Sequence, residues 1–93
     1  MTKITREEDE KKGMFTLFFD GMKAGEMTYY WKEEMRFVID HTEVGSEFAG
    51  KGLAKKLVLE AVAFARERNV KIAPLCSYAK KVLESMDEVK DLL

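Results

Sequence analysis

Residues 47–57, with the sequence EFAGKGLAKKL, decide how the chain is divided, because two glycines stand immediately before a helical pattern. Gly50 and Gly52 flank Lys51, and apolar residues recur at four-residue spacing from Leu53 onward. A glycine inside a helix costs about 1 kcal/mol relative to alanine. We therefore expect both glycines in the turn just before the helix N-terminus, where the first backbone N–H groups have no helical partner.

The pattern after Gly52 predicts an amphipathic helix of about five turns, ended by Asn69, which tolerates a left-handed conformation. Residues 70–73 then predict a short strand, closed by Pro74. The helix has a polar face, and its apolar stripe consists of Leu53, Leu57, Ala61 and Ala65, widened by Val58, Val62 and Phe64.

Alternating apolar residues before the glycines predict a three-stranded antiparallel meander between Met14 and Val44. Turns are expected at residues 21–25 and at Glu33-Glu34. Residues 1–12 either carry a short edge strand around Lys3 to Thr5 or stay loose. The residues expected to share a face within each strand are Phe15, Leu17 and Phe19, then Met27, Tyr29 and Trp31, then Met35, Phe37, Ile39 and His41.

The C-terminal part predicts two short helices. Ser77 is expected to cap the first of them, which runs through Leu83, and the capping-box pattern at residues 85–88 is expected to start the second, which ends at Leu92. The fold class is α/β (α+β), with strands and helices in the order β-β-β-α-β-α-(α) and residues 1–93 forming a single domain. The long helix, as a crossover, makes the strands on either side of it parallel.

The overall composition excludes several functions. With 16 Lys+Arg against 17 Asp+Glu, the net charge is -1, so we expect no nucleic-acid partner. No apolar run is long enough to span a membrane, and the charged N-terminus has no apolar signal region. A single cysteine, Cys76, favours a reduced, cytoplasmic location. One histidine and one cysteine predict no metal site.

The turn at residues 50–52, which we call the glycine turn, has two physical interpretations. Its helix N-terminus and its lysines suit an anion, most naturally a phosphate, but the glycines also make sense as a tight turn alone. Gly52 is followed by Leu53, which lacks the hydroxyl group of a P-loop, and Lys55 stands where a dinucleotide-binding turn needs glycine or alanine.

At this turn the sequence resembles the GNAT superfamily of acetyl-CoA-dependent N-acetyltransferases. Their signature, Gln/Arg-x-x-Gly-x-Gly/Ala, begins a long helix after a strand, and residues 47–52 match it in both glycines. Glu47 replaces the usual Gln or Arg and Ala49 replaces a frequent arginine, which removes two possible polar contacts with the cofactor. The backbone amides that hold the pyrophosphate remain.

Two further motifs resemble a small, truncated GNAT-like family: His41-Thr42-Glu43-Val44 before the turn, and the segment from Pro74 through Cys76-Ser77-Tyr78 after it. Larger GNAT enzymes have extra N-terminal helices and two more C-terminal strands that shape the acceptor pocket. Their absence implies an acceptor site that is open or is completed by a protein partner.

The resemblance implies a site for acetyl-CoA between two splayed parallel strands. The pantetheine arm would pair with backbone between Thr42 and Val44, and the thioester would reach toward Cys76 and His41. The residues implied for the pyrophosphate are Ala49, Gly50, Lys51, Gly52, Leu53 and Ala54.

The catalytic candidates each have a structural alternative. Cys76, at a helix start, is either a nucleophile for the acetyl group or a residue that lines the pocket, since most free cysteines are simply buried. His41 is either a general base or a hydrogen-bonded core histidine. Tyr78 either protonates the leaving thiolate or packs on its helix. The expected function is N-acetylation of an unidentified amine, and the alternative is a CoA-binding module without turnover.

Overall fold

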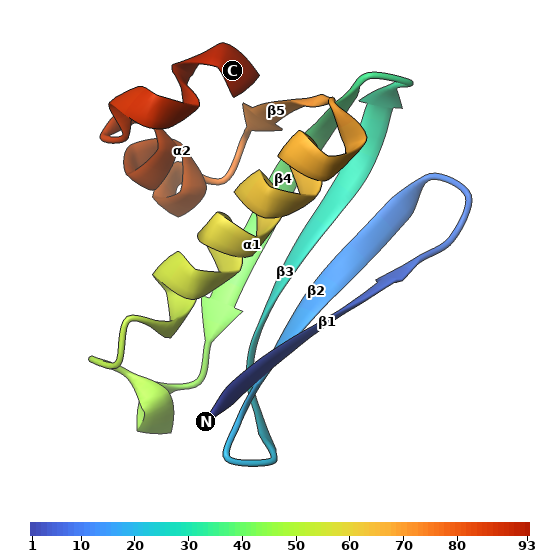
Figure 1. Ribbon diagram of the computed structural model, residues 1–93. Coiled ribbons are helices and arrows are strands. Elements are labelled where there is room, and N and C mark those ends of the chain that lie inside the picture. The colour runs from blue at the N-terminus through green and yellow to red at the C-terminus, as the bar shows by residue number, and fades with distance from the viewer.

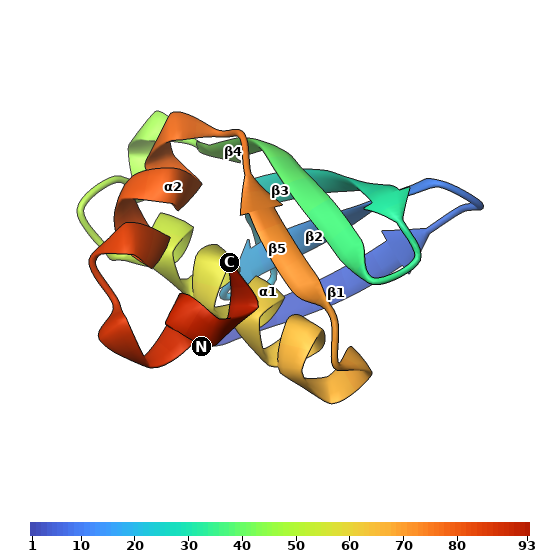
Figure 2. The same cartoon turned by 90° about the horizontal axis from the view of Figure 1, so that it is seen from above.

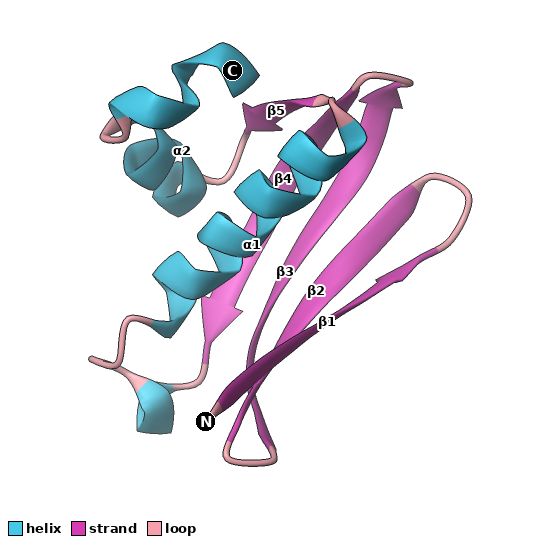
Figure 3. Cartoon of the chain, in the orientation of Figure 1, coloured by secondary structure: helices cyan, strands magenta, loops and turns pink.

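A computed structural model describes residues 1–93 as one five-stranded sheet with its helices on a single face (Figures 1 and 3). The strand order is β1-β2-β3-β4-β5, in which the first four are antiparallel and β5 is parallel to β4. The predicted α/β (α+β) class and the crossover are confirmed. The elements are β1 (Thr2–Glu8), β2 (Lys12–Phe19), β3 (Met22–Glu33), β4 (Arg36–Val44), η1 (Ser46–Phe48), α1 (Leu53–Arg68), β5 (Lys71–Pro74), α2 (Ser77–Glu84) and η2 (Asp87–Leu92).

The N-terminus forms a complete strand, so the meander has four strands and not three. β1 pairs with β2 along its whole length. The carboxylate of Glu8 accepts hydrogen bonds from the Tyr29 hydroxyl at 2.6 Å and from Trp31 Nε1 at 3.1 Å. Burial, followed by the hydrogen bond to Glu8, raises the pKa of Tyr29 to about 12. Besides its backbone pairing with β2, β1 is therefore linked to β3 through the carboxylate of Glu8.

Both predicted hairpin turns are displaced. Asp20 and Gly21 have positive φ angles of 50° and 85°, which make a two-residue turn, so residues 22–25 belong to β3. The second turn lies at Glu34-Met35, and Met35, which we expected in line with Phe37, is 54% exposed.

The core lies between the sheet and its helices. α1 places its predicted apolar stripe on β2, β3 and β4, and Leu57, Val58 and Ala61 are fully buried. In Figure 2 the helices gather on one side of the sheet, which leaves the other side without a covering element. We call this side the open face. Burying a leucine such as Leu57 stabilises the fold by about 2 kcal/mol.

A β-bulge in β4 reverses the expected orientation of His41. Tyr29 pairs with Ile39, but the next residue back along β3, Thr28, pairs with His41, so Asp40 is the extra residue. Neighbouring residues of a strand face opposite sides, and Tyr29 is buried. His41 therefore lies on the open face, with a 52% exposed side chain. The expectation that His41 shares a face with Phe37 and Ile39 is wrong, and so is the core-histidine alternative.

The helix ends differ in part from the prediction. Asn69 ends α1 in the left-handed conformation, as predicted. Cys76, not Ser77, is the N-cap residue of α2, and Ser77 is its first helical residue. The predicted capping box does not form, because Ser85 Oγ donates to the Val82 carbonyl and residues 87–92 form a 3-10 helix. None of the helices is long and apolar enough to cross a membrane.

Candidate functional site

The two parallel strands separate after four residue pairs. Ile39 is the last residue of β4 to pair with β5, opposite Pro74. Its carbonyl accepts the N–H groups of both Leu75 and Cys76, each at 2.9 Å. Beyond this point residues 40–44 have no strand partner on the β5 side, because the chain turns away into α2. The separation leaves an unpaired strand edge beside the start of a helix.

The glycine turn presents a run of unpaired amides. Gly50 and Gly52 have φ angles of 79° and 72°, and Gly52 is the N-cap residue of α1 without a side-chain cap. The N–H groups of residues 50–55 donate to no acceptor in the protein, whereas the Ala49 N–H donates to the Ser46 carbonyl at 3.2 Å. Of the six residues implied for the pyrophosphate, Ala49 is therefore the one whose amide is already used.

The space beside the two glycines is open. A Cβ atom built on Gly50 or Gly52 would meet no other atom within 4 Å. Both glycines are thus needed for their positive φ angles, and nothing in the protein covers them. Lys51 lies with Nζ 5.2 Å from the centroid of the Phe19 ring, and Lys55 and Lys56 are exposed on the first turn of α1. Free amides, a helix N-terminus and three lysines together favour a polyanion.

Cys76 lies where β4 and β5 separate. Its half-buried thiol donates to Thr42 Oγ1 at 3.6 Å. Burial opposes the thiolate, but hydrogen bonds from the Ala79 N–H, the Thr42 side chain and the Tyr78 N–H outweigh burial and lower the pKa of Cys76. A smaller contribution from the Thr42 N–H lowers the pKa of Cys76 further. A lowered pKa increases the share of thiolate, which is the reactive form of a cysteine side chain.

The remaining predicted residues divide between the two faces of β4. Thr42 pairs with the buried Met27, so its side chain faces the core side together with Cys76, and Val44 packs against the core. His41 lies on the open face, where Nε2 is 3.4 Å from Glu43 Oε1. The Tyr78 side chain is 38% exposed on α2 and makes no hydrogen bond. Cys76 and Thr42 are brought together, whereas His41, on the other face of β4, makes its hydrogen bond to Glu43.

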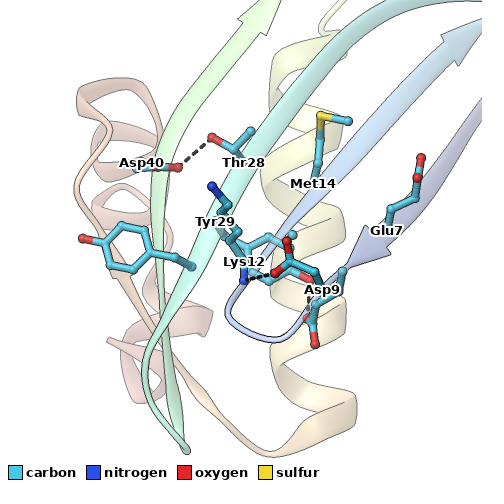
Figure 4. Close-up of a pocket in the computed structure, with 10 residues that line it drawn as sticks. Glu7, Asp9, Lys12, Met14, Thr28, Tyr29 and Asp40 are labelled. Carbon is cyan, nitrogen blue, oxygen red and sulfur yellow. Dashed lines mark hydrogen bonds between the residues drawn. The ribbon is translucent and has the colours of Figure 1, made fainter.

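Asp40 is a residue that the sequence pattern did not single out. Its side chain is exposed on β4, and its Oδ1 accepts a hydrogen bond from Thr28 Oγ1 at 2.7 Å (Figure 4). Alternation from the buried Ile39 places Asp40 on the open face, and the bulge brings His41 to the same face. His, Cys, Asp and Glu side chains form no group of three that could hold a metal ion.

Sequence comparison identifies the family. The family model described as GCN5-related N-acetyl-transferase matches residues 14–92. Protein NATD1 from Gallus gallus is 32% identical over 82 residues, which cover 87% of this chain and 74% of that protein. Protein NATD1 from Homo sapiens is 30% identical over 82 residues, which cover 87% of this chain and 73% of that protein.

Structure comparison agrees. The NMR solution structure of a GCN5-like N-acetyltransferase candidate from Staphylococcus aureus has a TM-score of 0.71 at 36% identity, covering 97% of this chain and 85% of that one. A streptothricin acetyltransferase candidate from Bacillus anthracis, solved in complex with acetyl coenzyme A, shares the fold with a TM-score of 0.64 at 16% identity. The match covers 80% of this chain and 47% of that one. The separated strands, the glycine turn and these matches together show that the chain belongs to the GCN5-related N-acetyltransferase family.

Proposed function

We propose that the protein transfers the acetyl group of acetyl-CoA to an amine. The observation that carries this proposal is the run of unpaired amides at residues 50–55, which lies next to the unpaired edge of β4 at residues 40–44. The first feature suits the pyrophosphate of CoA and the second suits an extended chain with its own amide groups, as pantetheine is. Few other ligands contain both parts.

The bound cofactor would follow β4 from the glycine turn toward Cys76. The amides of Gly50 to Ala54 would hold the pyrophosphate, assisted by Lys51, and the backbone between Thr42 and Val44 would pair with the pantetheine arm. The thioester would then lie near the Thr42 N–H, which can polarise its carbonyl as negative charge develops on the oxygen. The acetyl-CoA complex of the Bacillus anthracis neighbour supports this choice of cofactor.

Two routes of acetyl transfer are consistent with this site. In the direct route the amine attacks the thioester carbon, a C–N bond forms, the C–S bond breaks, and CoA leaves as a thiolate that takes up a proton. In this route His41 would accept the proton of the attacking amine, and Tyr78 would protonate the thiolate. In the covalent route the Cys76 thiolate first takes the acetyl group from CoA, and the amine then attacks the new thioester.

A CoA-binding module without turnover is the second candidate. The observation that favours it is the open face, because no element of the chain covers the side of the sheet where His41 lies. In this case Cys76 would line the thioester pocket without reacting.

Intact-protein mass spectrometry after incubation with acetyl-CoA, together with a free-thiol assay for released CoA, separates these candidates. We expect CoA release that depends on an added pool of lysine-containing peptides. An acetyl group that appears on the wild-type protein but not on Cys76→Ala selects the covalent route. Since Cys76 is the only cysteine, the thiol assay on Cys76→Ala has no background from the protein. Binding of acetyl-CoA without any CoA release would leave only the binding module.

A further inference from the structure

The open face carries one straight row of side chains from the edge of the sheet to the bulge. Glu7 pairs with Met14, Met14 with Thr28, and Thr28 with His41. Directly paired residues lie on the same face, so all four point away from the core. Strands are about 4.8 Å apart, and the row therefore spans about 14 Å from His41 to Glu7.

A groove of about 490 Å³ is lined by Glu7, Met14 and Thr28 of this row and by Asp40, the neighbour of His41 (Figure 4). Figure 4 views the sheet with α1 behind it, and Glu7, Met14, Thr28 and Asp40 extend along the near side. The groove is acidic. Its charged side chains on the open face are Glu7, Asp9 and Asp40, opposed by Lys12, whereas the carboxylate of Glu8 is turned to Tyr29 and Trp31.

The acidic groove ends at the proposed reaction centre. Asp40 accepts a hydrogen bond from Thr28 and directly precedes His41, at the point where β4 and β5 separate. A positively charged group in the groove is thereby guided to the side of β4 where an amine would meet the thioester. The opposite end of the groove, at Glu7 and Asp9, is too distant to act on the same amine.

An apolar surface continues the groove on its other side. Tyr30 belongs to both, and from it the surface extends along Val38 and Pro74 to Leu75, which is 68% exposed. Both the groove and this surface are shallow and open. Sites for small molecules enclose most of their ligand, whereas an extended peptide is held on an open surface by a few side chains.

We infer that the open face is the docking surface for the acceptor, and that the acceptor is a protein segment with two basic side chains. This inference rests on the proposed function. One lysine reaches past Asp40 to the thioester, and the second basic side chain lies between Glu7 and Asp9. An extended peptide advances about 3.3 Å per residue, so a 14 Å separation corresponds to about four residues.

The test uses fluorescent peptides with one acceptor lysine and with arginine, alanine or glutamate placed four residues before or after it. Binding is measured by anisotropy without cofactor, and acetylation is measured with saturating acetyl-CoA. We expect affinity to fall from arginine to alanine to glutamate, about fivefold per step for one placement. Glu7→Lys should remove or reverse this preference, whereas Glu67→Lys, on the exposed side of α1, should leave it unchanged.

Equal binding of the three peptides, or equal loss of the preference in both variants, would overturn the docking surface. A polyamine such as spermidine serves as the alternative acceptor, and its acetylation with a higher kcat/KM than the best peptide would overturn the assignment to a protein segment. Failure to bind acetyl-CoA would count against the proposed function alone, because the peptide titration needs no cofactor.

Discussion

The thiol of Cys76 is hydrogen-bonded to Oγ1 of Thr42 across the point where β4 and β5 separate. These residues are 34 positions apart in the chain, and the last backbone contact between their strands is the Ile39 carbonyl. The N–H groups at the start of α2 surround the same sulfur. The protonation state of this one thiol therefore reports on the geometry of the proposed thioester site.

Thr42→Val should raise the pKa of Cys76. The thiolate accepts a hydrogen bond from the Thr42 hydroxyl, and valine cannot supply it. Alkylation by iodoacetamide, followed as a function of pH, should reach half of its maximal rate at a higher pH than in the wild type. The Thr5→Val variant on β1, where the residue lies on the open face, is the matched control and should leave the curve in place. A curve that does not move in Thr42→Val would show that this hydroxyl does not stabilise the thiolate.

Gly50→Glu should weaken CoA binding by about tenfold or more, because it places a carboxylate beside the pyrophosphate and forces a side chain into a positive φ angle of 79°. Gly21→Glu is the matched control. Gly21 has a φ angle of 85° and equally open surroundings, but it lies in the hairpin between β2 and β3. Calorimetric titration measures the affinity, and thermal unfolding should show similar destabilisation in both variants. Equal affinities in the two variants would mean that the pyrophosphate is bound elsewhere.

His41→Gln should lower kcat for a peptide amine by about 100-fold if His41 accepts the amine proton, with little change in the affinity for acetyl-CoA. The affinity for acetyl-CoA should change little because His41 lies on the open face beside Asp40, away from the glycine turn. Glu43→Gln, which changes the carboxylate 3.4 Å from the imidazole, should have a much smaller effect. Steady-state kinetics of both variants make the comparison, and an unchanged kcat in His41→Gln would remove this residue from the mechanism.

Glu8→Ala should lower the free energy of unfolding by about 2 kcal/mol, because the Tyr29 hydroxyl and the Trp31 Nε1–H lose their acceptor. Burial opposes the charge of Glu8, but these hydrogen bonds outweigh burial, and the pKa of Glu8 is lowered from 4.5. A lowered pKa means that the ionised group stabilises the folded state above pH 4.5. This contribution is lost as the pH falls through the folded-state pKa.

The difference in stability between the wild type and Glu8→Gln should therefore shrink in acid. Urea unfolding at a series of pH values measures it, and Glu7→Gln, on the opposite face of β1, is the control. A difference that stays constant down to about pH 3 would show that the charge of Glu8 does not contribute.

Local patterns in the sequence were sufficient for most of the fold. The stripe from Leu53 to Ala65 is buried as predicted, and Asn69 ends α1 in the left-handed conformation. Gly50 and Gly52 lie in the turn before the N-terminus of α1, and both have positive φ angles. These features depend on neighbouring residues alone, which is why spacing and residue type were enough to predict them.

Features set by partners distant in the chain were predicted only in part, since a short edge strand around Lys3 to Thr5 was one of two alternatives for residues 1–12 and the bulge was not expected. β1 has few apolar residues, and its Glu8 is fixed by Tyr29 and Trp31 on β3. The bulge at Asp40 depends on the register between β3 and β4, and a one-residue slip turns His41 to the other face. Nothing in the alternation of apolar residues marks either event. The row from Glu7 to His41 therefore became visible only in the structure.

The central claim is that acetyl-CoA is held between the glycine turn and the edge of β4. The most direct test is a titration of ¹⁵N-labelled protein with acetyl-CoA, followed by two-dimensional NMR of the backbone amides. We predict the largest shifts at the amides of residues 50–55 and of Thr42 to Val44, with small shifts in β1. No shifts at saturating acetyl-CoA, or shifts confined to other parts of the sheet, would contradict the claim.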